Sequence, residues 1–391
     1  MHLDLTDEQK ALQLELREYF NKLVTAEKRV EQDEEEEMGD AWQGMVHQMG
    51  KDGWLGIGWP KEFGAQGRGP VDQLIFYEEA GRAGAPIPLV TINTVGPTLA
   101  QYGTDEQKAF FLPKILAGEI QFAIGYSEPE AGTDLASLRT RAVRVDGTYI
   151  VNGQKVFTTG GHVADYVWLA CRTDPDAPKH RGISILIVDT NDPGYSSTPI
   201  HTLAGGFTNA TYYQDVRVPL NRLVGEENGG WRMITTQLNF ERVALGPAGR
   251  LFRQLDAVTG WAKETKAPDG RRMIDQEWVR INLATVRAKA EACSLMNWRI
   301  AALQEHGGLR AGDASALKVF GTELRIEVNR LLMEVLGPEA TIQKGSPRAM
   351  FDGLFEVTYR GAIVGTFGGG VNEVQREIIG AAGLGMPRVP R

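Results

Sequence analysis

The spacing of hydrophobic residues predicts that both ends of the chain are helical. Up to about residue 119, apolar side chains recur every three or four positions, as in the first stretch, where Leu12 and Leu16 share one face. Thr6 stands three residues before a glutamine, which is typical of a capping box at the start of a helix. The same period returns in the last third of the chain. We therefore expect an N-terminal helical domain over residues 1–120 and a C-terminal helical domain over residues 231–391.

Between these parts the pattern changes to the alternation that is typical of β-strands. Residues 182–190 are a nearly continuous apolar run, which predicts a buried strand. Asn152 and Gly153 stand between two strand-like arms, which is a strong signal for a two-residue hairpin turn. We expect a small β domain over residues 121–230. The predicted fold class is therefore α+β with several domains.

The composition is that of an ordinary globular protein of 391 residues, with 42% hydrophobic residues and a formal net charge of −8. This negative charge argues against nucleic acid and against an anionic membrane surface as main partners. No apolar run approaches the roughly twenty residues that span a bilayer, and the amino terminus lacks the profile of a signal peptide, so we expect a cytoplasmic location. Cys171 and Cys293 stand outside any motif, and the histidines lack metal-binding spacing, so neither a disulfide nor a metal site is predicted.

A carboxylate interrupts the apolar face of the predicted helix that begins at Trp231. Ile234 and Leu238 continue that face, and Glu241 follows at the next helical step. Burial without a cation raises the pKa of a glutamate toward neutrality, which suits a general base. A structural ion pair between Glu241 and Arg242, or another cation, is the alternative, because such pairs also place carboxylates on buried faces.

Three segments are rich in glycine and hydroxyl side chains, which allow a ligand to approach the backbone closely. They cover residues 125–137, 157–161 and 366–370. The third stands at the predicted start of a helix, which is a favourable position for an anion or a carbonyl oxygen. Each segment can equally be explained locally, as a loop with side-chain turns or as the end of a strand. None of them has the glycine pattern of a dinucleotide-binding Rossmann fold.

The segment GYSEPEAGTD at residues 125–134 matches the first signature of the acyl-CoA dehydrogenase family, and LGIGWPKEFGAQG at residues 55–67 resembles its amino-terminal loop. The resemblance extends in collinear order over nearly the whole chain. It implies an α-helical domain, a central β-barrel and a carboxy-terminal four-helix bundle, in agreement with the predicted order of helices, strands and helices. It also implies FAD as cofactor and an acyl-CoA substrate that undergoes α,β-desaturation. In that reaction a carboxylate removes the α-proton while the β-hydrogen leaves as hydride to the flavin.

The resemblance assigns cofactor contacts to two of the glycine- and hydroxyl-rich segments. In the family, the first contacts the flavin ring and the ribityl chain, and the second lies against the other face of the ring. By position these contacts fall on Tyr126, Ser127, Gly132 and Thr133, and on Phe157, Thr158 and Thr159. Thr133 is also near the position that contacts CoA. Arg242 matches an arginine close to the bound thioester, so both residues are expected to bind substrate.

The family places its catalytic glutamate at one of two positions, and the sequence distinguishes them. The commoner position, in a late YEGT-like motif, corresponds here to Gly369, which cannot accept a proton. The other position directly precedes an arginine on a helix and corresponds to Glu241. The resemblance and the apolar helix face therefore indicate the same base. The N–H of Gly369 is expected to bind the thioester carbonyl and to stabilise the enolate-like charge.

Two segments that lend contacts to a neighbouring subunit's FAD in the family's symmetric tetramers depart from the pattern. Residues 261–270 lack the arginine and the Phe-Gly pair, and residues 334–338 replace a QxxGG-like segment. This implies a heteromer in which a homologous subunit supplies the missing contacts, so that half of the possible sites hold FAD. The chain resembles the base-bearing subunit of actinobacterial α2β2 enzymes that act on steroid side-chain CoA esters. The family resemblance also implies an electron-transfer flavoprotein as acceptor.

Two other functions are compatible with the same fold. The chain would be a non-catalytic structural subunit if it only completed another subunit's site, although Glu241 argues against this. It would be an acyl-CoA oxidase or a flavin monooxygenase if oxygen had ready access to the reduced flavin. Residues 89–101, which are expected to line the acyl pocket, have mostly small or moderate side chains, which is compatible with a bulky ring system.

Overall fold

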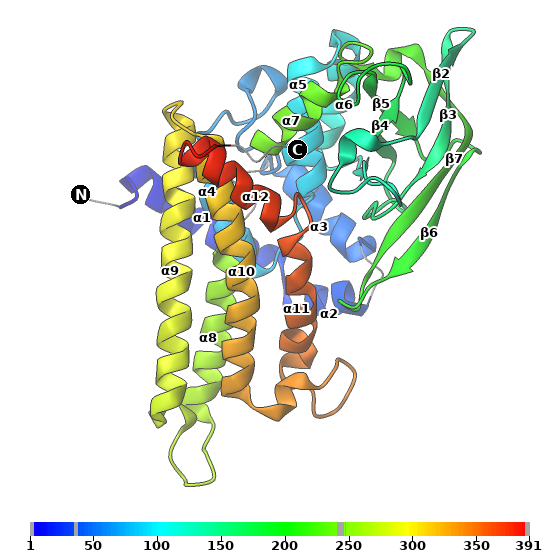
Figure 1. Cartoon of the computed structure of the whole chain (residues 1–391). Helices are drawn as coiled ribbons and strands as arrows, with labels where there is room; N and C mark the ends of the chain where they lie inside the picture. The colour runs from blue at the N-terminus through cyan, green and yellow to red at the C-terminus, as the bar shows by residue number, and fades with distance from the viewer. Residues whose placement is uncertain (1–3, 35–37, 241–245, 247, 388–391) are drawn as a thin grey trace.

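The computed structural model describes residues 4–34, 38–240, 246 and 248–387, and it shows two helical parts with a β-sheet beside them (Figure 1). In the N-terminal part, α4 packs against α1 and against the C-terminal helices α8 and α9. The helices of this part are α1 (Asp7–Leu23), α2 (Ala26–Glu34), α3 (Asp40–Lys51), α4 (Pro70–Ala83), α5 (Gly96–Tyr102) and α6 (Asp105–Leu116), with the π-helical segment η2 (Val90–Val95) directly before α5.

Local sequence signals begin two of these helices. The hydroxyl of Thr6 accepts a hydrogen bond from the N–H of Gln9, and the Gln9 side chain accepts one from the N–H of Thr6. The same reciprocal pair joins Thr104 and Gln107 at the start of α6. Both capping boxes satisfy N–H groups that have no partner within the first helical turn. The predicted capping box at Thr6 is therefore confirmed.

Eight strands form one mixed sheet. They are β1 (Phe122–Gly125), β2 (Arg141–Val145), β3 (Thr148–Lys155), β4 (Tyr166–Arg172), β5 (Ile183–Asp189), β6 (Tyr195–His201), β7 (Phe207–Pro219) and β8 (Leu223–Val224). Their order is β6-β7-β3-β2-β4-β5-β8, and β1 pairs in parallel with β4. β5 is buried over all but its last residue, which confirms the predicted buried strand. The sheet curves around its own apolar core, because β5 and β7 approach each other without being hydrogen-bonded neighbours.

The predicted hairpin turn at Asn152-Gly153 is wrong. Both residues lie inside β3, where the register with β7 shifts and Gly153 adopts a φ of 151°. Asn152 Nδ2 donates to Asp215 Oδ1 on β7 at 2.9 Å, so the pair supports a bulge rather than a reversal of the chain. The turn between β2 and β3 is formed by Asp146 and Gly147, whose φ angles are 46° and 76°. An Asp-Gly pair satisfies the positive φ angles of a two-residue turn as well as Asn-Gly does.

In the C-terminal part, α8, α9, α10 and α11 run side by side as a bundle (Figure 1). α10 contacts α8, α9 and α11, and α8 also contacts α9, around a continuous apolar core. α7 precedes the bundle and contacts η2, α5 and β5, so it lies where the two helical parts and the sheet meet. The helices of this part are α7 (Gly230–Phe240), α8 (Gly249–Glu264), α9 (Glu277–Glu305), α10 (Ala311–Leu336), α11 (Leu354–Ala362) and α12 (Asn372–Ile378).

The predicted fold class is confirmed, because helices, a sheet and a helical bundle follow one another along the chain. Within the described ranges, no helix combines the length and the apolar character that a membrane span requires.

Candidate functional site

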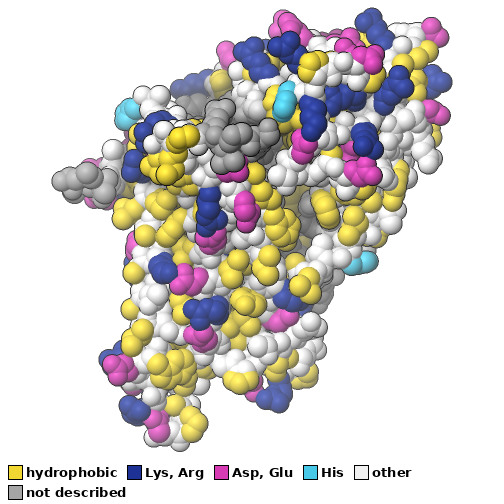
Figure 2. All heavy atoms as spheres, viewed as in Figure 1, with side chains coloured by type: hydrophobic (Ala, Val, Ile, Leu, Met, Phe, Trp, Pro, Cys, Tyr) yellow, Lys and Arg dark blue, Asp and Glu magenta, His cyan; other side chains and the backbone are white. Residues whose placement is uncertain are grey.

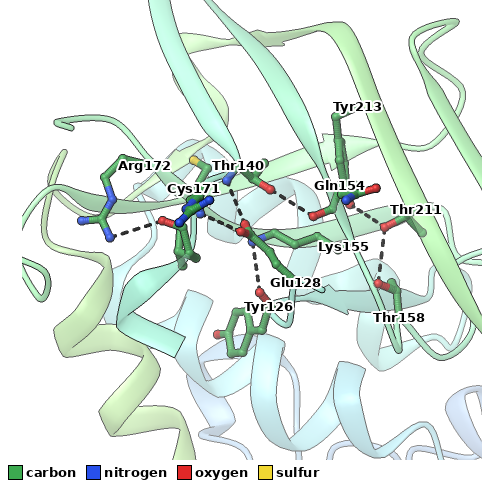
Figure 3. A network of polar contacts seen from close by, with 12 residues as sticks. Tyr126, Glu128, Thr140, Gln154, Lys155, Thr158, Cys171, Arg172, Thr211 and Tyr213 are labelled. Carbon is green, nitrogen blue, oxygen red and sulfur yellow. Dashed lines mark hydrogen bonds and ion pairs between the residues drawn. The ribbon is translucent and has the colours of Figure 1, made fainter. Parts of the chain in front are cut away.

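A buried ion pair anchors the loop that follows β1 (Figure 3). Lys155 lies at the end of β3 with a fully buried side chain, and its Nζ is 2.8 Å from Oε1 of Glu128. The same Nζ donates to the carbonyl oxygen of Tyr126 at 3.0 Å. The Glu128 carboxylate also accepts the backbone N–H groups of Arg139 at 2.6 Å and Thr140 at 2.8 Å. Both ends of the first glycine- and hydroxyl-rich segment are therefore fixed to β3 by one pair of charges.

The ionised form of this pair is favoured by its surroundings. Burial raises the pKa of Glu128, but Lys155 and the donors at Thr140 outweigh burial and hold the pKa below its ordinary value. Burial also lowers the pKa of the Lys155 ammonium. The carboxylate nevertheless remains charged, because three donors surround it and such charge-assisted hydrogen bonds are strong.

The structure brings the two predicted cofactor segments together. The carbonyl oxygen of Ser127 accepts the N–H of Val156 at 2.9 Å, directly before the second segment. Phe157 then adopts a φ of 59° and leaves 67% of its surface exposed. A left-handed backbone is rare for a bulky residue and is found mainly where function requires it. In the first segment, Gly132 borders open space, since no described atom lies within 4 Å of the position that a Cβ on this residue would occupy.

The threonines of the second segment face β7. Thr158 is fully buried, and its N–H donates to the carbonyl oxygen of Asn209 at 2.9 Å. Its hydroxyl lies 3.3 Å from that of Thr211, and the hydroxyl of Thr159 lies 3.2 Å from that of Thr208. The side chain of Thr158 therefore holds the segment to the sheet. In the first segment, Thr133 is exposed.

Two residues that the sequence analysis missed lie beside this segment. Asn209 is fully buried, yet its Nδ2 has no hydrogen-bond partner in the described ranges, and neither does the buried Nε2 of His162. Nδ1 of His162 and Oδ1 of Asn209 form a hydrogen bond at 3.1 Å. A buried donor without a hydrogen-bond partner destabilises the folded state by about 1–3 kcal/mol, so such an atom often has a bound ligand as its partner. A flavin with its ribityl chain offers several acceptors, and the residues present fit FAD on this ground.

A third missed residue connects the cofactor loop to α7. The Tyr126 hydroxyl accepts a hydrogen bond from Nε1 of Trp168 at 3.2 Å and donates to Oε1 of Gln237. Gln237 is 2% exposed, and within the described part of the chain its Nε2 has no hydrogen-bond partner. The only sequence signal for Gln237 is its spacing, because it stands four residues before Glu241 on the predicted helix.

The third glycine-rich segment forms a turn that a buried lysine supports. Gly369 and Gly370 have φ angles of 66° and 99°, and nothing lies within 4 Å of the position that a Cβ on Gly369 would occupy. Lys318 on α10 is 4% exposed, and its Nζ donates to the carbonyl oxygen of Gly370 at 2.6 Å and to Oδ1 of Asn372 at 2.7 Å. The open space at Gly369 suits a ligand that approaches its backbone. Lys318 carried no motif in the sequence.

A cavity of about 460 Å³ lies between α8, α10 and α11 and reaches this turn at Gly368. Its wall includes Arg250 and Arg325, and burial lowers the pKa of both guanidinium groups. Gly365 adds a further position without a side chain. The cavity therefore combines small residues with positive charge next to the predicted oxyanion-binding turn.

The predicted base Glu241 and the predicted substrate residue Arg242 lie outside the described residues. On α7, which ends one residue before Glu241 in the sequence, Ile234 is buried and Trp231 is half-buried. Farther along the chain, Oε1 of Glu78 accepts the N–H of Ala248 at 2.8 Å, directly before α8. Glu78 on α4, which the sequence analysis also missed, thereby fixes the backbone on the far side of this segment.

Comparison with known protein families matches the chain in three consecutive parts. Residues 6–119 match the N-terminal domain of acyl-CoA dehydrogenases, residues 123–216 the middle domain, and residues 228–384 the C-terminal domain. Members of this family are FAD-dependent oxidoreductases.

Individual relatives cover the complete chain. The chain is 54% identical to acyl-CoA dehydrogenase FadE26 and 55% identical to acyl-CoA dehydrogenase FadE29, both of Mycobacterium tuberculosis, over 100% of each protein. Among solved structures, the ChsE4-ChsE5 complex from Mycobacterium tuberculosis contains a chain that is 55% identical with a TM-score of 0.93. The Tcur3481-Tcur3483 steroid ACAD contains one that is 50% identical with a TM-score of 0.94. Both alignments cover 100% of each chain.

Proposed function

The chain belongs to the acyl-CoA dehydrogenase family, and from this premise we propose that it catalyses the α,β-desaturation of a steroid side-chain CoA ester with Glu241 as base. The observation that carries the proposal is the joining of the two cofactor segments at Ser127 and Val156, beside buried donors that have no partner. The names of the solved relatives support the steroid substrate, since one of them is described as a steroid ACAD.

The residues that would hold FAD come from both joined segments. Tyr126, Ser127, Gly132 and Thr133 would contact the flavin ring and the ribityl chain from one side, and Phe157, Thr158 and Thr159 from the other. FAD, when bound, supplies the acceptor for the hydride that leaves the β-carbon. Of these residues, Phe157 and Thr133 have exposed side chains. Thr158 is buried, and its N–H and carbonyl oxygen are already bonded to Asn209 and Gly161, so it would contribute by holding the segment in place.

The protein's own residues would handle the proton and the charge. Glu241 would remove the α-proton, and apolar neighbours such as Ile234 would keep water from competing for the base. The N–H of Gly369 would donate to the thioester carbonyl, whose oxygen gains negative charge as the proton leaves. Arg242 and Thr133 would bind the CoA ester. An electron-transfer flavoprotein is the acceptor that we propose for the reduced enzyme.

A heteromeric α2β2 assembly with a homologous subunit completes the proposal. Residues 261–270, which depart from the family pattern, are followed directly by two arginines. Both form hydrogen bonds within the chain, since Arg271 donates to Asp269 at 2.9 Å and Arg272 donates to Asp275 at 2.8 Å. Glu334 accepts a hydrogen bond from Asn282 at 3.1 Å. These groups are therefore poorly placed to serve a neighbour's FAD. Two solved relatives are themselves complexes of two named chains.

The bundle also presents an apolar surface that a partner subunit would cover. Figure 2 shows apolar side chains spread among charges over the face of the bundle helices. Several large ones are at least one-third exposed along α11 and the turns on either side of it, namely Phe351, Val357, Tyr359, Ile363, Val364 and Phe367. Exposed apolar patches of this kind are typical of protein interfaces.

The decisive experiment replaces the proposed base. Glu241→Gln should abolish flavin reduction by an acyl-CoA while FAD stays bound, because the amide cannot take the α-proton. Glu277→Gln, at the exposed start of α9, is the matched control and should leave reduction unchanged. Anaerobic stopped-flow absorbance measures both. Unchanged reduction in Glu241→Gln would contradict the mechanism.

The assembly and the substrate need separate tests. The chain purified alone should contain little FAD. When it is purified together with a homologous subunit, the complex should contain one FAD for every two chains. A ratio of one FAD per chain in the isolated protein would contradict the heteromer. A steroid CoA ester should be oxidised in preference to straight-chain acyl-CoAs, and a preference for straight chains would remove the steroid assignment.

A further inference from the structure

The buried amide of Gln237 is oriented by its neighbours so that its donors point away from them. The hydroxyl oxygen of Tyr126 accepts a hydrogen bond from the indole N–H of Trp168. The same hydroxyl donates a hydrogen bond to Oε1 of Gln237. If the amide were turned over, the phenol would face an NH2 group, and its proton would lose its acceptor. The chain of hydrogen bonds therefore fixes Oε1 toward Tyr126 and Nε2 toward the opposite side.

On that opposite side Nε2 has no hydrogen-bond partner among the residues that the structure describes, although Gln237 is only 2% exposed. Leaving a buried amide donor without an acceptor costs about 1–3 kcal/mol. The neighbouring hydroxyl of Thr236 is satisfied, because it donates to the carbonyl oxygen of Arg232 at 2.9 Å and lies 3.3 Å from the Tyr102 hydroxyl. Among the described residues, the hydroxyl of Thr236 is thus satisfied, whereas the amide donor of Gln237 is not.

The position of Gln237 is where a ligand is expected. It contacts the first residue of the proposed cofactor loop, and its helix, α7, leads to the proposed base and packs against η2 and α5 in the proposed acyl-pocket segment. The π-helical form of η2 is itself common at functional sites. We propose that Nε2 of Gln237 is a ligand-binding donor that hydrogen-bonds a carbonyl oxygen of the bound complex. That oxygen belongs either to the acyl thioester or to the pyrimidine half of the flavin, and this inference rests on the proposed function for those ligands.

The test replaces the amide and measures binding in the FAD-loaded complex. Gln237→Met keeps the length and volume of the side chain but removes the donors. We would measure the dissociation constant of FAD, the visible flavin spectrum, and calorimetric binding of a steroid 2-enoyl-CoA, which carries the thioester carbonyl but is not oxidised further. The matching S-alkyl-CoA thioether, which lacks the carbonyl, is the reference ligand.

The two sources of the carbonyl give different results. If the thioester is the acceptor, Gln237→Met weakens enoyl-CoA binding about three- to tenfold and leaves the binding of thioether and FAD unchanged. If the flavin is the acceptor, FAD binding weakens by a similar factor and the flavin spectrum shifts, while both CoA ligands bind as before. Either result supports the donor role.

Two controls separate this role from a structural one. Gln107 is also buried, but its Nε2 donates to the carbonyl oxygens of Asn221 and Leu223, each at 2.8 Å. Gln107→Met should lower stability without changing ligand affinity. Tyr126→Phe breaks the bond to Gln237 from the other side but retains the amide donors, so it should reduce enoyl-CoA affinity less than Gln237→Met does. It is a control for the CoA ligands only, because Tyr126 is itself a proposed flavin contact.

Two outcomes would overturn the inference. Unchanged affinity for FAD and for the enoyl-CoA would mean that the amide does not serve a ligand. An equal loss for the enoyl-CoA and the thioether, reproduced by Tyr126→Phe, would show a structural effect. Because all readouts are binding constants and spectra, this inference can fail while Glu241→Gln still abolishes flavin reduction, and the reverse is also possible.

Discussion

The ammonium of Lys155 and the carboxylate of Glu128 meet at 2.8 Å in the interior of the sheet, and together they fix the loop that carries the first cofactor segment. Lys155 adds a bond to the carbonyl oxygen of Tyr126, and Glu128 adds two bonds from the backbone at the other end of the loop. The pair thus links the shape of the loop to β3, from which the second segment continues. We infer that the pair positions both segments relative to each other.

Loss of the Lys155 ammonium should therefore affect both stability and FAD binding. Lys155→Met leaves the buried Glu128 carboxylate without its cation, and breaking one half of a buried pair typically costs about 3–5 kcal/mol. Urea unfolding of the complex measures this loss, and bound FAD per complex should fall with it. Lys179→Met is the control, since Lys179 pairs at the surface with Asp134 of the same loop, and its loss should cost less than about 1 kcal/mol. Equal effects of the two substitutions would argue against a special role of Lys155.

The left-handed backbone of Phe157 predicts a conflict between stability and binding. A side chain at a φ of 59° costs about 1–2 kcal/mol relative to glycine, which adopts this conformation freely. Phe157→Gly and Phe157→Ala both remove the exposed ring, but only glycine also relieves the backbone. In FAD-free protein, Phe157→Gly should therefore be about 1 kcal/mol more stable than Phe157→Ala by thermal unfolding. Both variants should bind FAD more weakly than the native protein, and unchanged FAD affinity would show that the ring does not contact the flavin.

The features that the sequence predicted correctly are those that depend on residues close together in the chain. The capping box at Thr6 and the buried strand β5 depend on neighbouring residues, so their patterns are visible in a single segment. The turn at Asn152-Gly153 failed because Asp146-Gly147 offers the same turn chemistry six residues earlier, and no local signal ranks the two.

The missed site residues share a different cause. Gln237 is 111 residues from Tyr126, and Lys318 is 52 residues from Gly370, so their roles arise only when distant segments pack together. Glutamine and lysine are mostly exposed in proteins, so from a helical sequence pattern alone they are predicted to lie at the surface. The predicted cofactor residues belong to a motif, which is why the sequence could propose Tyr126 and Phe157 but not the residues that support them.

Glu78 predicts a specific dependence of stability on pH. Burial raises its pKa from 4.5 to about 7, although the N–H of Ala248 and the nearby Arg82 oppose this shift. A carboxyl group with a raised pKa binds its proton more tightly in the folded state, so its contribution is favourable below pH 4.5 and is lost as the pH rises toward 7. The loss amounts to about 3 kcal/mol above pH 7. Glu78→Gln keeps an acceptor for Ala248 without this titration.

The measurement is the free energy of unfolding of both proteins between pH 4.5 and 8. The native protein should lose stability relative to Glu78→Gln over the range from 4.5 to 7, and the difference should be constant at higher pH. A parallel course of the two curves would show that Glu78 titrates normally.

The support of the glycine-rich turn by Lys318 predicts a selective effect on turnover. Lys318→Met leaves the carbonyl oxygen of Gly370 and the amide oxygen of Asn372 without their buried donor, so the turn should shift and move the N–H of Gly369. If that N–H stabilises charge that develops as the proton leaves, kcat should fall by about tenfold or more while KM changes little, because the interaction is strongest in the transition state. Lys289→Met, which removes an ion pair with Glu327 at 2.5 Å between α9 and α10, is the matched control and should preserve kcat. A rise in KM with unchanged kcat would assign the turn to substrate binding instead, and no change in either would separate Lys318 from the reaction.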